Sequence, residues 1–325
     1  ISNFPDQSRA GSGGPSAVTV APGASVPGLA GGFRPTKSIP SSASAAISVA
    51  EAICGISVAT IPLTGQGTNG SVGLSTTELF FGVNGRVDCG TRATDRTFTL
   101  SNSGNQAFSW TGTLARGSSS PFTVTPNSGT VPAATGSITL SVSSVAIPTQ
   151  ATTVAEAFGD TLSIVTDVAN DSSHLITLHQ TANGAALTFA PTAIDFGTVP
   201  VNTTASAPLS VVNDGNAPAS VTLSSSSASF TLSPSGPVAV AGTGEGAFTG
   251  TFAPGGSAAR QDATVSMAVD AGGVLCAPLP APMTMTGVGT SGSVSYTPVA
   301  LDFGSVDCGA TAAPKTVTFS NGGNQ

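Results

Sequence analysis

The sequence predicts an all-β protein of tandem immunoglobulin-like antiparallel β-sandwich domains, each of about 110 residues. Three observations predict this fold. The 325 residues include 40 Gly and 23 Pro, with 39% hydrophobic and only 8% charged residues. Self-comparison finds an internal repeat, with intervals between matching glycines of 115 and 107 residues (Gly82, Gly197 and Gly304). Each repeat divides into roughly seven short alternating segments separated by Gly, Pro and Ser, which is typical of a two-sheet sandwich.

Each repeat begins with a strand-like motif that ends in Phe-Gly. Its three copies are Leu79-Phe80-Phe81-Gly82, Ile194-Asp195-Phe196-Gly197 and Leu301-Asp302-Phe303-Gly304. We expect the three phenylalanines to face the core and the following glycines to mark a bulge or turn. A second strand then ends in Asn-x-Gly-Asn, at residues 102–105, 213–216 and 321–324. We expect this motif to form a turn that requires positive φ.

These motifs divide the chain into two complete and two partial domains. Residues 1–72 resemble the later strands of a domain, because Leu63-Thr64-Gly65 matches Met285-Thr286-Gly287 222 positions later. Residues 73–186 and 187–290 read as complete immunoglobulin-like domains, and residues 291–325 as the first strands of a further one. The Ala/Ser-rich run from Ser41 to Ala52 leads into alternating apolar residues and is interpreted as strand.

The motifs resemble those of the ASH (abnormal spindle–hydin) immunoglobulin-like domains, which in bacteria are often labelled choice-of-anchor D domains. The resemblance rests on three segments, at 301–304, 317–324 and 63–67, and on their other copies. It implies sandwich domains arranged as beads in long secreted or surface-attached proteins, without enzymatic activity. The first complete domain departs from the pattern at Phe80, where the other copies have Asp, and around residues 84–86, where it has three extra residues.

Four cysteines occupy two repeating places. Cys54 and Cys276 are 222 positions apart in matching late segments, and Cys89 and Cys308 both lie in the first turn of a domain. The repeat symmetry favours the pairs Cys54–Cys89 and Cys276–Cys308, each joining two domains. Four cysteines allow three connectivities. Free buried thiols and bonds between chains remain the alternatives to these two pairs. Disulfides would indicate an oxidising compartment.

No motif predicts a catalytic, metal or cofactor site. His174 and His179 are five residues apart along one expected strand, so they face opposite sides and cannot share a metal. The run Gly242–Gly246 lies between strands and opens no helix, so we interpret it as a turn rather than a phosphate loop. The acidic residues of 167–171 lack the EF-hand pattern and are expected to form a solvated loop. We therefore expect no enzyme, cofactor or metal.

The expected function is structural. With nine Lys plus Arg and a net charge of -7, the chain has no basic patch for nucleic acid. It also lacks an apolar run long enough to span a membrane. We expect a segment of an extracellular, cell-surface filament that self-associates. Two readings of the partial end domains compete: the favoured one is a window cut from a longer bead string, and the other is completion head-to-tail between chains by strand pairing. The alternative function is an adhesin or non-catalytic spacer that binds a cell surface or glycans.

Overall fold

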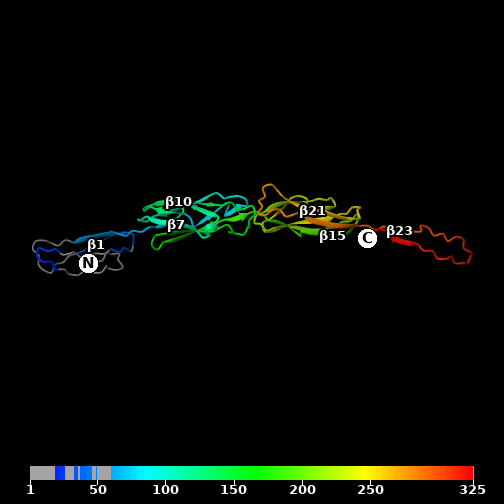
Figure 1. Cartoon of the computed structure of the whole chain (residues 1–325), viewed down its shortest axis with the longest axis horizontal. Helices are drawn as coiled ribbons and strands as arrows, with labels where there is room; N and C mark the ends of the chain where they lie inside the picture. Colours follow the sequence, from blue (N-terminus) through cyan, green and yellow to red (C-terminus); the bar gives the residue numbers. More distant parts are fainter. Residues whose placement is uncertain (1–18, 26–32, 36, 46–48, 50–59, 325) are drawn as a thin grey trace. The chain divides into compact units, whose positions relative to one another are not determined.

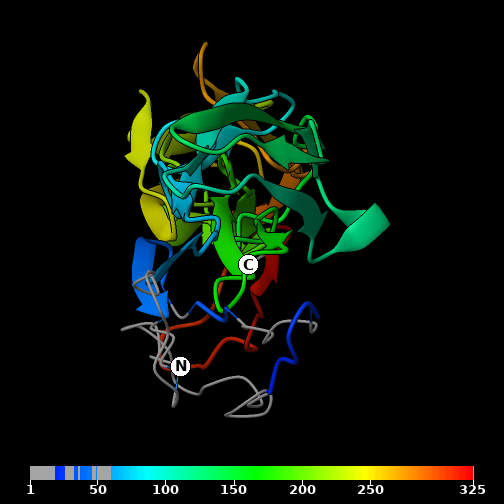
Figure 2. The same cartoon turned by 90° about the vertical axis from the view of Figure 1, so that its left-hand side faces the viewer.

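The computed structural model describes residues 19–25, 33–35, 37–45, 49 and 60–324. This part of the chain consists of strands, turns and irregular segments, with one 3₁₀ turn, η1 (Gly117–Ser119), and no α-helix (Figures 1 and 2). The predicted all-β fold is confirmed. No helix in the described residues is long and apolar enough to cross a membrane.

The first sandwich has one four-stranded and one five-stranded sheet. The four-stranded sheet is ordered β3 (Val72–Leu74), β6 (Arg96–Asn102), β10 (Gly136–Ser144) and β8 (Phe122–Thr125). The five-stranded sheet is ordered β4 (Glu78–Phe80), β12 (Ser173–His179), β11 (Asp160–Thr166), β7 (Phe108–Leu114) and β9 (Ser128–Val131). All pairs are antiparallel except the edge pair β4–β12, which is parallel.

The second sandwich repeats this arrangement. Its four-stranded sheet is ordered β14 (Leu187–Ala190), β16 (Ala205–Asn213), β20 (Gly244–Phe252) and β18 (Phe230–Ser233). Its five-stranded sheet is ordered β15 (Ala193–Pro200), β22 (Met283–Thr290), β21 (Arg260–Val269), β17 (Ala219–Ser225) and β19 (Val238–Val240). The edge pair β15–β22 is again parallel, so the sandwiches are not purely antiparallel as the sequence suggested.

Three further strand pairs lie outside the sandwiches. They are β1 (Pro40–Ala45) with β2 (Ile61–Gln66), β5 (Arg86–Asp88) with β13 (Thr181–Asn183), and β23 (Val294–Thr297) with β24 (Thr318–Asn321). The pair β5–β13 is parallel and the other two are antiparallel. The strand expected in the run from Ser41 to Ala52 is confirmed over Ser41–Ala45 by β1; residues 46–48 and 50–52 lie outside the described residues.

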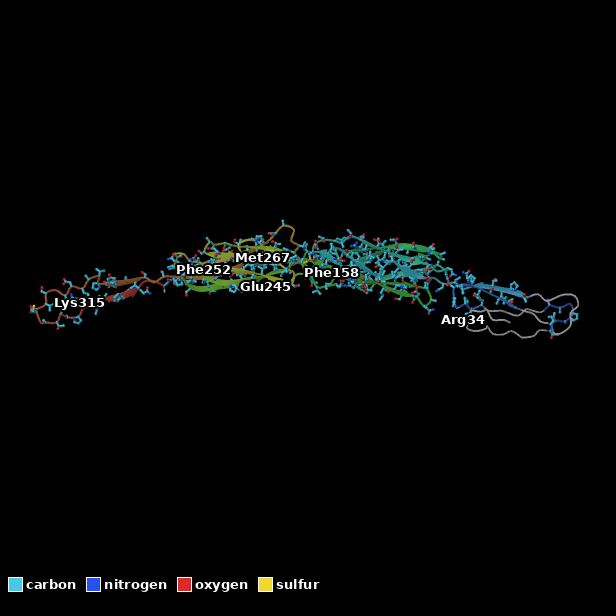
Figure 3. The ribbon with its side chains drawn as sticks, turned by 180° about the vertical axis from the view of Figure 1, so that it is seen from behind. Arg34, Phe158, Glu245, Phe252, Met267 and Lys315 are labelled. Atoms are coloured by element: carbon cyan, nitrogen blue, oxygen red, sulfur yellow. A yellow bond between two sulfur atoms is a disulfide. The ribbon has the colours of Figure 1, made fainter. Side chains whose placement is uncertain are left out.

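The cores follow from period-two alternation along the strands. In β16, Leu209 and Val211 are almost fully buried, whereas the alternate residues Ser210 and Val212 are half-buried. The second core joins residues of both sheets, among them Phe252 and Met267, which are labelled in Figure 3. Burial of apolar side chains in such a core is the main favourable contribution to folding. Trp110 is 2% exposed in the first core.

The chain forms two compact units. Unit 1 consists of Ile1–Phe81, Thr94–Val145 and Gly159–His179; unit 2 consists of Gly82–Ala93, Ala146–Phe158 and Gln180–Gln325. Segments 82–93 and 146–158 therefore pack with unit 2, although they fall within the expected domain 73–186. The domain boundaries drawn from the sequence remain a prediction.

The Phe-Gly motif behaves differently in its three copies. Phe81 is fully buried, and Phe196 packs against the second core. Phe303 is 48% exposed, contrary to the expectation of a core residue, because no second sheet faces it among the described residues. The glycine that follows has φ of +71°, +65° and +63° in the three copies, so the expected turn conformation is confirmed.

Candidate functional site

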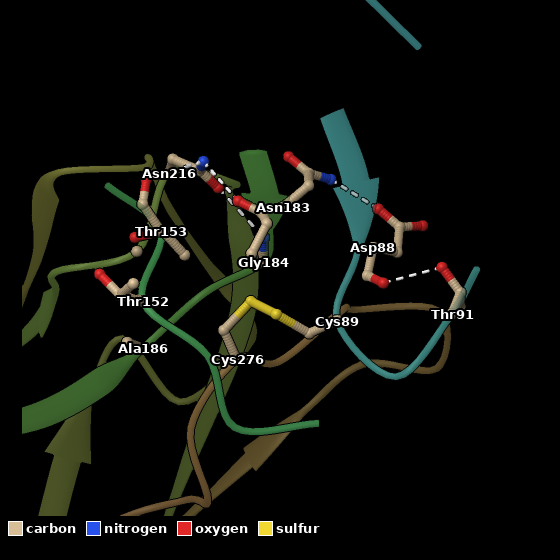
Figure 4. The surroundings of a disulfide bond; sticks show 12 residues. Asp88, Cys89, Thr91, Thr152, Thr153, Asn183, Gly184, Ala186, Asn216 and Cys276 are labelled. Atoms are coloured by element: carbon tan, nitrogen blue, oxygen red, sulfur yellow. Dashed lines mark hydrogen bonds between the residues drawn. A yellow bond between two sulfur atoms is a disulfide. The ribbon is translucent and has the colours of Figure 1, made fainter. Parts of the chain in front are cut away.

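The candidate site lies in unit 2, where the chain passes from one repeat to the next. Strand β5 follows the Phe-Gly turn and pairs with β13, so that Asp88 lies opposite Asn183 in the register. The Nδ2 group of Asn183 donates a hydrogen bond of 2.7 Å to Oδ1 of Asp88, as drawn in Figure 4. The residue after β5 is Cys89, and its backbone N–H donates to the carbonyl of Asn183 over 3.1 Å. These contacts fix the position of Cys89. We call Cys89, Asn183, Gly184, Asn216 and Cys276 the linker site.

Cys89 and Cys276 form a disulfide (Figure 4). Their Cα atoms are 5.4 Å apart, a usual spacing for such a bond, and 187 positions separate them in sequence. Cys276 is 3% exposed. Its backbone N–H donates to the carbonyl of Ala185 over 2.8 Å, and its carbonyl accepts from the N–H of Ala151 over 3.1 Å. The disulfide joins two segments far apart in sequence, and the backbone hydrogen bonds of Cys276 attach it to two more, at Ala151 and Ala185.

The disulfide pairs expected from the sequence are wrong. Cys89 is bonded to Cys276, which excludes Cys54–Cys89 and Cys276–Cys308, and Cys308 is a free, exposed thiol. Cys54 lies outside the described residues. The physical reason is the parallel pair β5–β13. It brings Cys89 beside residues 183–185, where Cys276 is also held, so closeness in sequence did not indicate closeness in space.

Gly184 leaves room for the disulfide. A Cβ atom at this position would lie 2.5 Å from Sγ of Cys276 and 3.1 Å from its backbone nitrogen. Real Cβ atoms do not approach sulfur so closely, and a sulfur bonded to a second cysteine cannot rotate away without moving that cysteine. The glycine is therefore required by close approach at this point.

Asn216 ties the same segment to the turn after β16. Its Nδ2 group donates to the carbonyls of Ala182, over 2.8 Å, and Thr153, over 3.3 Å. Its Oδ1 accepts from the N–H of Gly184 over 3.1 Å. One half-buried side chain thus satisfies three backbone groups from two segments. Buried backbone groups need such partners, because leaving them without one is costly.

The same three hydrogen bonds recur in all three repeats. Asn105 donates to the carbonyls of Gly67 and Ser38 and accepts from Asn69, over 2.9, 3.4 and 2.9 Å. Asn324 donates to the carbonyls of Gly289 and Ala258 and accepts from Ser291, over 2.9, 3.2 and 2.8 Å. The second asparagine of Asn-x-Gly-Asn therefore ties its turn to the segment that precedes the domain. The sequence motif shows that this asparagine recurs, but its role was not predicted from the sequence.

The glycine of Asn-x-Gly-Asn has a different role from the one predicted. Gly104, Gly215 and Gly323 do not have positive φ. Instead, an added Cβ at these three glycines would collide with the carbonyl oxygen of Asn69, Gly184 and Ser291 respectively. Each of these carbonyls lies in the segment just before the first strand of its repeat. The turn needs glycine for close backbone approach, not for a left-handed conformation.

None of the other residues singled out in the sequence belongs to the linker site. His179 stacks on Phe80 with ring centroids 4.4 Å apart, whereas Nε2 of His174 lies 3.3 Å from a carboxylate oxygen of Asp171. The turn expected over Gly242–Gly246 is confined to residues 242–243, because Gly244, Glu245 and Gly246 pair with β16 as the start of β20. Among the described residues, no three His, Cys, Asp or Glu side chains are grouped in a way that could hold a metal ion.

Comparisons with known proteins identify one family. Residues 185–274 match the ASH family model, described as abnormal spindle-like microcephaly-associated, ASPM-SPD-2-Hydin. The resemblance expected from the sequence motifs is confirmed for this segment, which includes most of the second sandwich. No curated protein sequence matches the chain.

Several solved structures are similar to the chain at low sequence identity. A protein of unknown function from Porphyromonas gingivalis W83 is 12% identical, with a TM-score of 0.27, over 67% of this chain and 99% of that one. The ASH/PapD-like domain 7 of human CEP192 is 10% identical, with a TM-score of 0.28, over 42% and 96%. The periplasmic chaperone SfaE is 16% identical, with a TM-score of 0.27, over 67% and 100%.

Proposed function

We propose that this chain, whose residues 185–274 match the ASH domain, is a non-catalytic structural segment of an extracellular filament at a cell surface. Its β-sandwich domains would serve as rigid building blocks, and the filament would grow by association of one copy with the next. The composition supports this reading, because 8% charged residues leave few side chains for acid–base chemistry and little charge repulsion between copies.

The Cys89–Cys276 disulfide is the observation that carries the proposal. It closes a loop across a sequence separation of 187 residues and holds segment 82–93 to the rest of unit 2. A bond of this kind prevents that segment from separating from unit 2 under force unless a covalent bond breaks. The hydrogen bonds of Asn216 reinforce the same place. Such bracing suits a protein that bears load outside the cell.

The same disulfide supports an extracellular location. Cytosolic thiols are kept reduced by glutathione and thioredoxin, whereas disulfides persist in secreted and surface proteins. Cys276 is buried and Cys89 is half-buried, which limits the access of a reductant to the bond once it has formed.

The test is assembly of the purified, oxidised chain. We expect the 325-residue chain to form filaments as its concentration is raised, seen by negative-stain electron microscopy and by analytical ultracentrifugation. A chain that stays monomeric at millimolar concentration and instead binds cells or a glycan array would contradict the filament and support an adhesin or spacer.

A further inference from the structure

We infer that the apolar face of residues 294–319 binds strand β2 (Ile61–Gln66) of a second copy of this chain. The inference rests on the proposed function and names the surface through which copies would associate. It is argued from the internal repeat, because the second sandwich contains the same two segments already packed together.

The apolar face of β23 and β24 is exposed, whereas the corresponding face of β14 and β16 in the second sandwich is buried. The strands β23 and β24 correspond to β14 and the end of β16, and they pair in the same register. The exposed fractions are 72, 55 and 71% at Val294, Tyr296 and Phe319, against 3, 6 and 0% at Leu187, Phe189 and Val211. Large apolar patches of this kind on a protein surface usually mark an interaction site.

Segment 299–306, within the same stretch of chain, also lacks a strand partner among the described residues. Its counterpart in the second sandwich, 192–199, largely coincides with β15, which pairs in parallel with β22 so that Ile194 lies opposite Met285. Residues 299–306 are not in a strand, and no described strand lies beside them. The N–H of Gly304 donates to Oδ1 of Asp302, and the carbonyl of Asp302 accepts from Nζ of Lys315, but the segment forms no strand ladder. A segment outside a ladder can pair with a strand from another chain.

Strand β2 corresponds to β22, the strand that fills this place in the second sandwich. Leu63 and Gly65 match Met285 and Gly287. The local packing matches too: an added Cβ at Gly65 would lie 2.8 Å from the ring of Phe33, and one at Gly287 would lie 2.5 Å from the ring of Phe252. Within the described residues, β2 pairs with β1 along one edge, and no described strand pairs with its other edge.

The two open edges define a register. By analogy with β15–β22, β2 of the second copy runs parallel to residues 299–306, and Leu63 lies opposite Leu301. Strand β2 carries no charged residue, so its burial leaves no unpaired charge. Because the two surfaces differ, each copy can bind one neighbour at each surface, and such a contact builds an open chain of copies unless it happens to close.

The experiment uses Leu63→Asp and Leu301→Asp in the full oxidised chain, followed by sedimentation. Each variant places a carboxylate in the inferred contact, and we expect association to weaken by more than about tenfold. Leu175→Asp is the matched control. It makes the same substitution at a leucine of β12 that is 59% exposed and lies outside both inferred surfaces. We expect Leu175→Asp to assemble like the wild type.

Mixing the two variants tests the direction of the contact. Leu63→Asp keeps an intact face at 301, and Leu301→Asp keeps an intact β2, so an equimolar mixture should form dimers and nothing longer. Dimers would also show that both variants are folded. If the wild type forms filaments but both variants do so equally well, the inferred surface is wrong and the proposed function stands. If the wild type does not associate at all, the filament itself is contradicted.

Discussion

Asn216 shows how much of this structure depends on single polar residues. Its amide group both donates and accepts, and the carbonyls of Ala182 and Thr153 and the N–H of Gly184 need both functions at once. Asp and Ala each lack part of that chemistry. Asn105 and Asn324 meet the same requirement, which explains why asparagine ends the motif in every repeat.

We predict that Asn216→Asp lowers the free energy of unfolding by about 2 kcal/mol, because two carbonyls lose their donor and face a carboxylate instead. The measurement is equilibrium denaturation by urea. Asn202→Asp is the control, since Asn202 is exposed in the same unit, and its effect should stay within about 0.5 kcal/mol. Equal losses in the two variants would contradict the role of Asn216.

Gly184→Ala should also destabilise the protein, by about 1–3 kcal/mol, because the new methyl group overlaps Sγ of Cys276. The matched control is Gly236→Ala, where an added Cβ meets nothing within 4 Å and φ is not positive. That variant should match the wild type or be slightly more stable. Thermal unfolding of the oxidised proteins checks both, and an unchanged Gly184→Ala variant would show that the disulfide can shift.

At the scale of elements, the same sequence motif has two outcomes. The ring of Phe196 lies with its centroid 5.9 Å from those of both Phe230 and Phe252, inside a complete sandwich. The ring of Phe303 has Nζ of Lys315, a residue labelled in Figure 3, 5.8 Å from its centroid and remains 48% exposed. The neighbouring strands, not the motif, decide whether the phenylalanine is core.

We therefore predict different costs for the two truncations in dilute, monomeric protein. Phe196→Ala should lower the free energy of unfolding by about 2–3 kcal/mol, since it removes a ring packed against the core. Phe303→Ala should cost less than about 0.5 kcal/mol, as for most surface substitutions. Urea denaturation at low protein concentration measures both, and equal costs would mean that Phe303 is covered in solution.

At the scale of the whole molecule, the disulfide sets the stability of unit 2. Closing a loop of this length removes about 5 kcal/mol of chain entropy from the unfolded state on the simplest model. Both cysteines, and segment 146–158, whose Ala151 N–H donates to the carbonyl of Cys276, belong to unit 2. The stabilisation should therefore appear in one unit and not in the other.

The double variant Cys89→Ser/Cys276→Ser should unfold with a free energy about 3–5 kcal/mol lower than that of the wild type. Hydrogen exchange followed by mass spectrometry should show faster exchange in segments 82–93 and 146–158, with unit 1 little changed. Cys308→Ser is the control, because that thiol is free and exposed. Faster exchange in Cys308→Ser as well would show that Cys308 also bonds.

The sequence by itself determined the repeat, the all-β fold, the Phe-Gly turns and the recurring asparagines. These features are local, because alternation and turn residues act over a few neighbours. Tertiary structure alone decided which cysteines meet, why Gly184 and Gly215 must be glycine, and whether Phe196 or Phe303 is buried. Each of these depends on segments far apart in the chain, such as the parallel strands β5 and β13, which bring Cys89 to Cys276 across 187 positions. Spacing along the sequence carries no record of such contacts.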